Sequence, residues 1–125
     1  NKDKAITFVS ENGFREERSW HELNLNVSKI SKFLKSINIK KKDRVAAYMP
    51  NTIETIEAFI ASSSLGTIWS SCSPDFGVRG VVERFSQINP KVLFGIFLKL
   101  RDLRAKLRLK NQKYFIKINF YLIQS

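Results

Sequence analysis

The stretch with the most chemical interest is the loop at residues 72–77, read CSPDFG. It follows a β-prone run at residues 67–71, and Pro74 prevents that run from continuing as a strand. Asp75 stands before a helical pattern, so we expect its carboxylate to cap the helix. In open α/β sheets, loops at the carboxyl ends of strands are the places where ligands bind. The sequence therefore points to this loop as the first candidate for a ligand site.

Few other side chains could do chemistry. Cys72 is the single cysteine, and it has no neighbouring His or Lys in the sequence that would favour a thiolate, so we expect a buried, unreactive thiol. His21 is the single histidine, so we expect neither a metal site built from several histidines nor a His-based catalytic triad. The sequence also lacks the Gly-x-x-x-x-Gly-Lys-[Ser/Thr] and Gly-x-Gly-x-x-Gly motifs. No independent phosphate-binding motif is therefore predicted.

The elements that would position the loop alternate between strand and helix. Two β-prone runs flank Asn12-Gly13, a strong hairpin signal, and predict an opening hairpin. The continuous apolar run at residues 45–49 is typical of a parallel strand buried on both faces. A last strand is predicted at residues 92–96. The fold class is therefore α/β: an opening β-hairpin, then alternating helix and strand, forming part of a doubly wound parallel sheet.

Three helices are predicted from apolar residues that repeat with helical spacing. The first begins at a capping box formed by Ser19 and Glu22, and Asn51 with Glu54 suggests a similar start for the second. The expected buried stripes are Leu23, Val27, Ile30, Leu34 and Ile37 in the first helix, Ile53, Ile56, Phe59, Ile60 and Leu65 in the second, and Val78, Val81, Val82, Phe85 and Ile88 in the third.

The charge of the chain is concentrated near one end. The 125 residues carry a formal net charge of +11, but residues 1–98 contribute only +4 and residues 99–125 contribute +7. Charge of that kind alone would favour binding to nucleic acid or to an anionic membrane. A single cysteine and the lack of a long apolar run favour a cytoplasmic protein without a membrane span.

Two long phrases carry a resemblance to a known family. DRVAAYMPN at residues 43–51 and SLGTIWSSCSPDFGVRGVVERFSQINPKVLFGI at residues 64–96 resemble the acetoacetyl-CoA synthetases, a branch of the adenylate-forming acyl-CoA synthetases. The resemblance covers residues 1–96 and only an early part of a family chain several times longer. It implies a fragment of the large N-terminal domain of such an enzyme. We expect residues 97–125 to be a basic tail foreign to the family.

The resemblance also implies a reaction, in which ATP, acetoacetate and CoA give acetoacetyl-CoA, AMP and diphosphate. Family members use a Gly and Ser/Thr-rich phosphate loop, an acidic ribose ligand, a Thr-Glu pair that helps to hold magnesium, and a C-terminal lysine. None of these is recognised in this chain, so no catalytic or metal-binding residue is assigned and the chain alone is expected to be inactive. ATP, CoA and Mg are expected only for the parent enzyme.

The one functional region of the family that the resemblance implies for this chain is the path of the CoA thiol. Pro74, Asp75 and Phe76 are implied to line that path, although a helix cap and a packed aromatic ring would explain the same residues. Trp69 is a candidate for the pocket wall or for the core of the sheet. Arg79 and Arg84 could meet CoA phosphates in a whole enzyme or could simply be solvated charges. Acetoacetate, ATP and CoA are the expected partners of the parent enzyme.

The tail leaves three alternatives open, because its composition changes abruptly after Ile96. It could be read out of frame from an AT-rich gene, selected as a basic amphipathic segment, or a divergent family segment. A different class of function, a small basic protein whose tail contacts nucleic acid or an anionic membrane, is favoured only by the tail's charge. The near-ordinary charge of residues 1–98 favours the ligase fragment.

We predict a frame break close to codons 95–97 of the gene, because the resemblance stops there. Translating the downstream DNA in all three forward frames should restore an acyl-CoA synthetase sequence in another frame. If no frame restores one, the tail has to be explained as a sequence in its own right.

Overall fold

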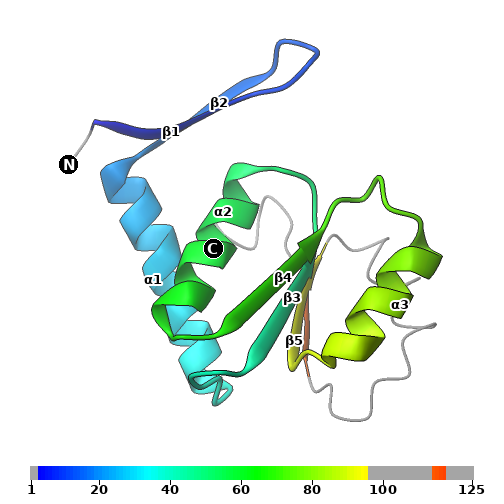
Figure 1. Cartoon of the computed structure of the whole chain (residues 1–125). Coiled ribbons are helices and arrows are strands. Elements are labelled where there is room, and N and C mark those ends of the chain that lie inside the picture. Colours follow the sequence, from blue (N-terminus) through cyan, green and yellow to red (C-terminus); the bar gives the residue numbers. More distant parts are fainter. Residues whose placement is uncertain (1–2, 96–113, 118–125) are drawn as a thin grey trace.

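The computed structural model describes residues 3–95 and 114–117 (Figure 1). Their order is a hairpin followed by strictly alternating helices and strands up to β5, with one further strand near the end of the chain. The elements are β1 Lys4–Val9, β2 Arg15–Ser19, α1 Trp20–Ser36, β3 Arg44–Tyr48, α2 Ile53–Ser64, β4 Ile68–Cys72, α3 Val78–Ile88, β5 Val92–Gly95 and β6 Tyr114–Lys117.

The opening hairpin is confirmed. Strands β1 and β2 pair antiparallel, and the turn between them has Gly13 at φ +87°, a conformation that glycine adopts without a side-chain clash. The Asn12 side chain accepts a hydrogen bond from the Phe14 N–H at 3.2 Å and helps to close the turn. In Figure 1 the hairpin projects from the body of the protein, so it needs specific contacts to hold its position.

The N-cap predicted for α1 is confirmed, whereas the Glu22 carboxylate bonds to the Ser19 hydroxyl and not to a backbone N–H as the capping box predicts. Ser19 is the N-cap, and its hydroxyl accepts a hydrogen bond from the Glu22 N–H at 3.1 Å. The Glu22 carboxylate accepts a bond from the Ser19 hydroxyl at 3.3 Å. Leu23 and Leu34 of the expected stripe are buried. The capping residues and the apolar period therefore fix both the start of α1 and the face that it buries.

The second sheet is parallel throughout, with strand order β4-β3-β5-β6. Strand β3 pairs with β4 on one side and with β5 on the other, and Val45, Ala46, Ala47 and Tyr48 have no exposed surface. The predicted last strand is observed as Val92–Gly95, and Ile96 lies outside the described residues. The central position predicted for the apolar run of β3 is therefore confirmed.

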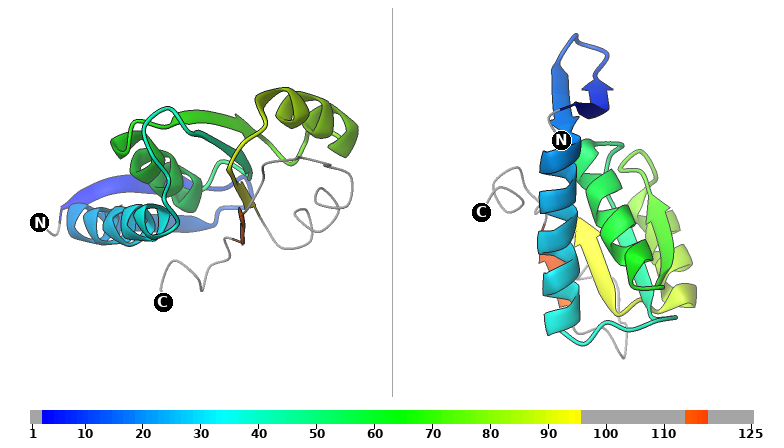
Figure 2. Two further views of the ribbon diagram at one scale, coloured as in Figure 1. Left: turned by 90° about the horizontal axis from the view of Figure 1, so that it is seen from below. Right: turned by 90° about the vertical axis from the view of Figure 1, so that its left-hand side faces the viewer.

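Helices cover both faces of this sheet, as Figures 1 and 2 show, so the doubly wound arrangement is confirmed. Alternate side chains of β3 and β5 contribute to two separate cores. On the α1–α2 face the buried residues are Leu34, Ile39, Val45, Ala47, Met49, Ala58, Val92 and Phe94. On the α3 face they are Ala46, Tyr48, Cys72, Val81, Phe85 and Leu93.

The buried face predicted for α2 is wrong in most of its residues. Ile53 is buried, but Ile56, Phe59 and Ile60 are 42%, 45% and 36% exposed. The helix turns smaller or charged side chains inward instead. These are Glu54, Glu57, Ala58, Ala61 and Ser62. Small side chains at Ala58 and Ala61 allow the close approach that helix packing requires, and the two carboxylates have a buried cationic partner.

The second helix also begins differently from the prediction. Its N-cap is Thr52 rather than Asn51, and no side chain accepts a bond from the first turn. Instead, the Thr55 hydroxyl donates to the Pro50 carbonyl at 2.7 Å. Glu54 is drawn into the interior and is not free to form a capping box.

A buried ionic cluster joins the hairpin to the helices. Arg18 of β2 lies 3.5 Å from Glu54 and 3.4 Å from Glu57, both of α2, and 3.2 Å from Glu16 of its own strand. Asn26 of α1 donates to Glu57 Oε2 at 2.7 Å. The Arg18 Nε contact with Glu57 is an ion pair without hydrogen-bond alignment, and Glu57 Oε1 has no hydrogen-bond partner among the described residues. Burial raises the pKa of Glu57, while Asn26 and Arg18 partly oppose the rise.

We predict that Glu57→Gln changes the pH dependence of stability. A carboxyl whose pKa is raised on folding favours the folded state at low pH, and this contribution is lost as pH rises from the ordinary glutamate pKa through the raised one. The unfolding free energy of the wild type should therefore fall relative to Glu57→Gln over that range. Urea unfolding at several pH values measures the difference, and the exposed Glu83→Gln is the matched control. A constant difference between wild type and Glu57→Gln would contradict the prediction.

Candidate functional site

The loop at residues 72–77 lies at the carboxyl end of β4 and leads into α3 (Figure 1). Because β3 and β4 are parallel and Tyr48 is opposite Cys72 in the register, the carboxyl ends of both strands lie at the same edge. The connections that leave them pass to opposite faces of the sheet, by α2 and by α3 respectively. The predicted position of the loop, at the carboxyl end of a parallel strand, is therefore confirmed.

The three loop candidates are accessible to different degrees. Pro74 is half-buried, whereas Asp75 and Phe76 are exposed. A turn holds them together: the Phe76 N–H donates to the Ser73 carbonyl at 3.0 Å, and the Asp75 N–H donates to the Ser73 hydroxyl at 3.3 Å. The Ser73 hydroxyl in turn donates a hydrogen bond to Asp75 Oδ2 at 3.3 Å. The loop thus has an internally bonded backbone and presents a carboxylate and an aromatic ring to solvent.

The expected capping role of Asp75 is wrong. The N-cap of α3 is Gly77, and no side chain accepts a bond from the first turn of the helix. Asp75 precedes the cap by two residues, and the turn from Ser73 to Phe76 directs its carboxylate to Ser73 instead.

Trp69 lies on the other face of the sheet from Cys72. Its ring is 5.5 Å from that of Phe59 and 6.1 Å from that of Phe94, measured between centroids. It packs against the core between the sheet and α1 and α2, whereas Cys72 belongs to the core under α3. The structure therefore does not bring Trp69 together with the three loop candidates.

Two side chains that reach the loop region have roles that the sequence did not reveal. The Tyr48 hydroxyl donates to the Phe76 carbonyl at 2.8 Å. The exposed Arg84 of α3 donates a hydrogen bond through Nη1 to Cys72 Sγ at 3.6 Å. Cys72 itself is buried, as predicted. The signal for Tyr48 was available, because a phenol at the end of a buried strand needs a partner for its hydroxyl.

Burial raises the pKa of Tyr48, and the nearby Cys72 and Asp75 raise it further. The hydroxyl therefore remains protonated at neutral pH, and it serves as a hydrogen-bond donor to the loop.

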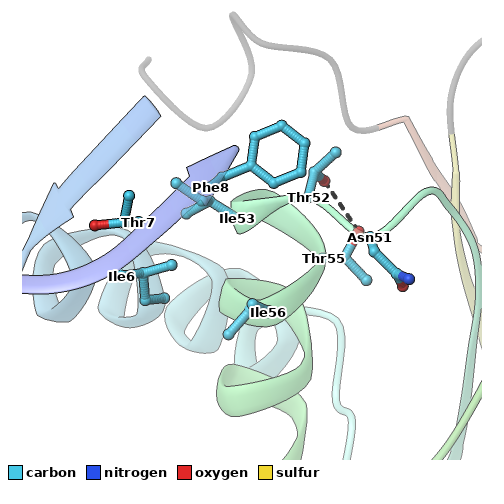
Figure 3. Close-up of a pocket in the computed structure, with 8 residues that line it drawn as sticks. All are labelled: Ile6, Thr7, Phe8, Asn51, Thr52, Ile53, Thr55 and Ile56. Carbon is cyan, nitrogen blue, oxygen red and sulfur yellow. Dashed lines mark hydrogen bonds between the residues drawn. The ribbon is translucent and has the colours of Figure 1, made fainter. Parts of the chain in front are cut away.

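A separate groove of about 200 Å³ lies between the hairpin and the start of α2 (Figure 3). It contains none of the four candidate residues. Its lining residues are Ile6, Thr7, Phe8, Asn51, Thr52, Ile53, Thr55 and Ile56. Thr52 and Thr55 share a hydrogen bond of 3.1 Å, so part of the polar capacity of this wall is already used internally.

Within residues 3–95 and 114–117, no group of three or more His, Cys, Asp or Glu residues is arranged to hold a metal ion. No helix in the same part of the chain has the length and apolar character needed to cross a membrane.

The comparisons with known proteins agree with this geometry. The solved structure of acetoacetyl-CoA synthetase from Streptomyces lividans has a TM-score of 0.85 and 32% sequence identity, covering 96% of this chain and 20% of that one. An acyl-CoA synthetase from Brucella canis has a TM-score of 0.77 at 20% identity, which supports the fold alone. The fold is thus that of the N-terminal domain of adenylate-forming enzymes.

Sequence comparison defines the family. A family model described as AMP-binding enzyme matches residues 1–119, and the chain belongs to this family. Acetoacetyl-CoA synthetase from Mus musculus is 42% identical over 96 residues, and acetoacetyl-coenzyme A synthetase from Rhizobium meliloti is 48% identical over 88 residues. These matches cover 75% and 70% of this chain but 14% of each relative. The chain therefore spans a small part of the length of these relatives.

We predict that Asp75→Ala changes the unfolding free energy by less than about 0.5 kcal/mol, the usual range for an exposed site without a special role. The reason is that Asp75 does not cap α3 and bonds only within its own turn. Chemical denaturation measures the change. Ser19→Ala, which removes the observed cap of α1, is the control and should cost about 1 kcal/mol. A loss for Asp75→Ala as large as that for Ser19→Ala would contradict the prediction.

Proposed function

We propose that the chain supplies an early part of the N-terminal domain of an acetoacetate–CoA ligase. The parent reaction converts ATP, acetoacetate and CoA into acetoacetyl-CoA, AMP and diphosphate. The observation that carries the proposal is the 42–48% identity to acetoacetyl-CoA synthetases from a mammal and a bacterium, together with the close fit to a solved structure with the same name. In this proposal acetoacetate, ATP, CoA and Mg are bound by the parent enzyme and not by this chain alone. The parent enzyme is located in the cytoplasm.

In this proposal the loop forms one wall of the path by which the CoA thiol reaches the acyl group. The position of Pro74, Asp75 and Phe76 at the carboxyl edge of the sheet supports this role, as does the exposure of the last two. Trp69 is left out of this wall, because its ring packs against Phe59 and Phe94 on the opposite face of β4. No residue of the chain is assigned to catalysis or to metal binding.

The boundary at residue 96 is part of the same proposal: residues 1–96 are family sequence and residues 97–125 are a basic tail, out of frame or non-native. Two observations count against a foreign tail. The family model extends to residue 119, and β6 in the tail pairs with β5. Strand pairing uses main-chain groups that every residue possesses, so a β-prone tail of any origin could occupy the open edge of β5.

We predict that the purified chain alone releases no acetoacetate-dependent pyrophosphate, because positioning of ATP carries most of this chemistry and the chain has no phosphate-binding motif. By contrast, a chimera should retain acetoacetate-dependent exchange of pyrophosphate into ATP. In this chimera residues 3–95 replace the matching segment of the Streptomyces lividans enzyme. Turnover by the chain alone would refute the first statement. A folded chimera without exchange would refute the proposal that this segment belongs to such a ligase.

A further inference from the structure

We propose that Tyr48 is a positioning residue, whose hydroxyl fixes the Phe76–Gly77 peptide and thereby holds the ligand-facing loop in place. The expected effect on CoA binding rests on the proposed function. The structural basis of the inference does not depend on that function. It concerns one hydrogen bond, from the Tyr48 hydroxyl to the Phe76 carbonyl, of 2.8 Å.

The ring and the hydroxyl of Tyr48 have separable tasks. The ring has no exposed surface and packs in the core under α3 with Cys72, Val81 and Phe85. A phenylalanine would fill the same space. The hydroxyl adds nothing to that packing, and its one described contact is the loop carbonyl at residue 76. The presence of the oxygen is therefore explained by the loop and not by the core.

This bond reaches a point of the loop that is otherwise weakly anchored. Phe76 has a 56% exposed side chain, and Gly77 is exposed as well. A peptide bond is planar and trans, so fixing the carbonyl of residue 76 toward the core also sets the Gly77 N–H to point away from it. Gly77 is the N-cap of α3, and its carbonyl accepts from the Val81 N–H at 3.2 Å. The orientation of one peptide thus links the rigid strand, the loop and the first turn of the helix.

The anchor is strong because of where Tyr48 sits. Strand β3 is paired on both sides, and its last residue lies opposite Cys72, the residue from which the loop departs. Arg84 bonds to the same Cys72 from α3. The loop is therefore held at its start by Cys72 and at its end by the Tyr48 hydroxyl, while Pro74 and Asp75 span the interval between these two points.

The first experiment uses the full 125-residue chain and Tyr48→Phe, which removes one oxygen. Amide hydrogen exchange at Phe76 and Val81 should accelerate by about 5- to 10-fold, the change expected when one hydrogen bond is removed. Exchange in β3 should change by less than about twofold. The control is Thr67→Val, which removes a hydroxyl-to-carbonyl bond of 2.7 Å, from Thr67 to Ser62, at the opposite end of β4. It should leave Phe76 unchanged. Equal exchange at Phe76 in the wild type and Tyr48→Phe would overturn the inference.

The second experiment uses the chimeric ligase and separates positioning from stability. Tyr48→Phe should raise the KM for CoA or slow thioester formation by about 5- to 10-fold, and leave adenylate formation within about twofold. Phe76→Ala tests the loop itself. If Phe76→Ala slows thioester formation and Tyr48→Phe does not, the inference about Tyr48 fails and the proposed function stands. If neither variant affects thioester formation, the loop is not part of the thiol path, and the inference and the proposed role of the loop both fail. Equal losses in both half-reactions would reduce Tyr48 to a structural role.

Discussion

The burial of β3 on both faces is the constraint on which the other described elements depend. Its side chains alternate between two cores, so each residue must suit the helix layer that covers it. Ala46 and Ala47 are small, which lets helices approach the sheet closely on either face. Tyr48, at the carboxyl end, is the exception in size and polarity. The strand that organises the core therefore also delivers a hydrogen-bond donor to the edge where ligands bind in folds of this kind.

The hairpin depends on a second interaction, the buried contact of Arg18 with Glu54 and Glu57. A buried ion pair contributes little net stability, because desolvation offsets the attraction, but losing one partner leaves a buried charge without compensation. Here the cost is shared: Asn26 from α1 bonds to Glu57, and Glu16 contributes a further carboxylate to Arg18. The cluster therefore specifies where the hairpin docks more than it stabilises the fold, and it places β1 beside α2, where the groove forms.

Much of this fold could be predicted from local pattern. The hairpin follows from Asn12-Gly13, the start of α1 from Ser19, and the central strand from an uninterrupted apolar run. The predicted face of α2 failed because hydrophobic period alone assumes that charged residues face solvent. That assumption is wrong where a distant arginine, 36 residues away from Glu54 in the sequence, supplies a buried partner. A pairing over that separation leaves no local signal in a single sequence.

The candidate site shows the same division. The sequence identified the loop and its place at the end of a strand, because Pro74 and the change of pattern are local features. It misassigned Asp75, because aspartate is common both at helix caps and within turns. The backbone path decides whether its carboxylate bonds to Ser73 or to the first turn of α3, and here the partner is Ser73. The contacts of Tyr48 and Arg84 join residues that are 28 and 12 positions apart from their partners. What the sequence locates is therefore the loop and the edge of the sheet where it lies, and what it omits is the set of contacts that fix the shape of the loop.

The chemistry available at this edge follows from how its polar groups are already used. Ser73 is engaged with Asp75, the Phe76 carbonyl accepts from Tyr48, and Cys72 is buried against Arg84. None of these arrangements creates a nucleophile or a base beside an open position, which is the geometry that catalysis needs. They do create a loop whose backbone is held from within while an aromatic ring and a carboxylate face outward. A surface of that kind can guide and orient a ligand.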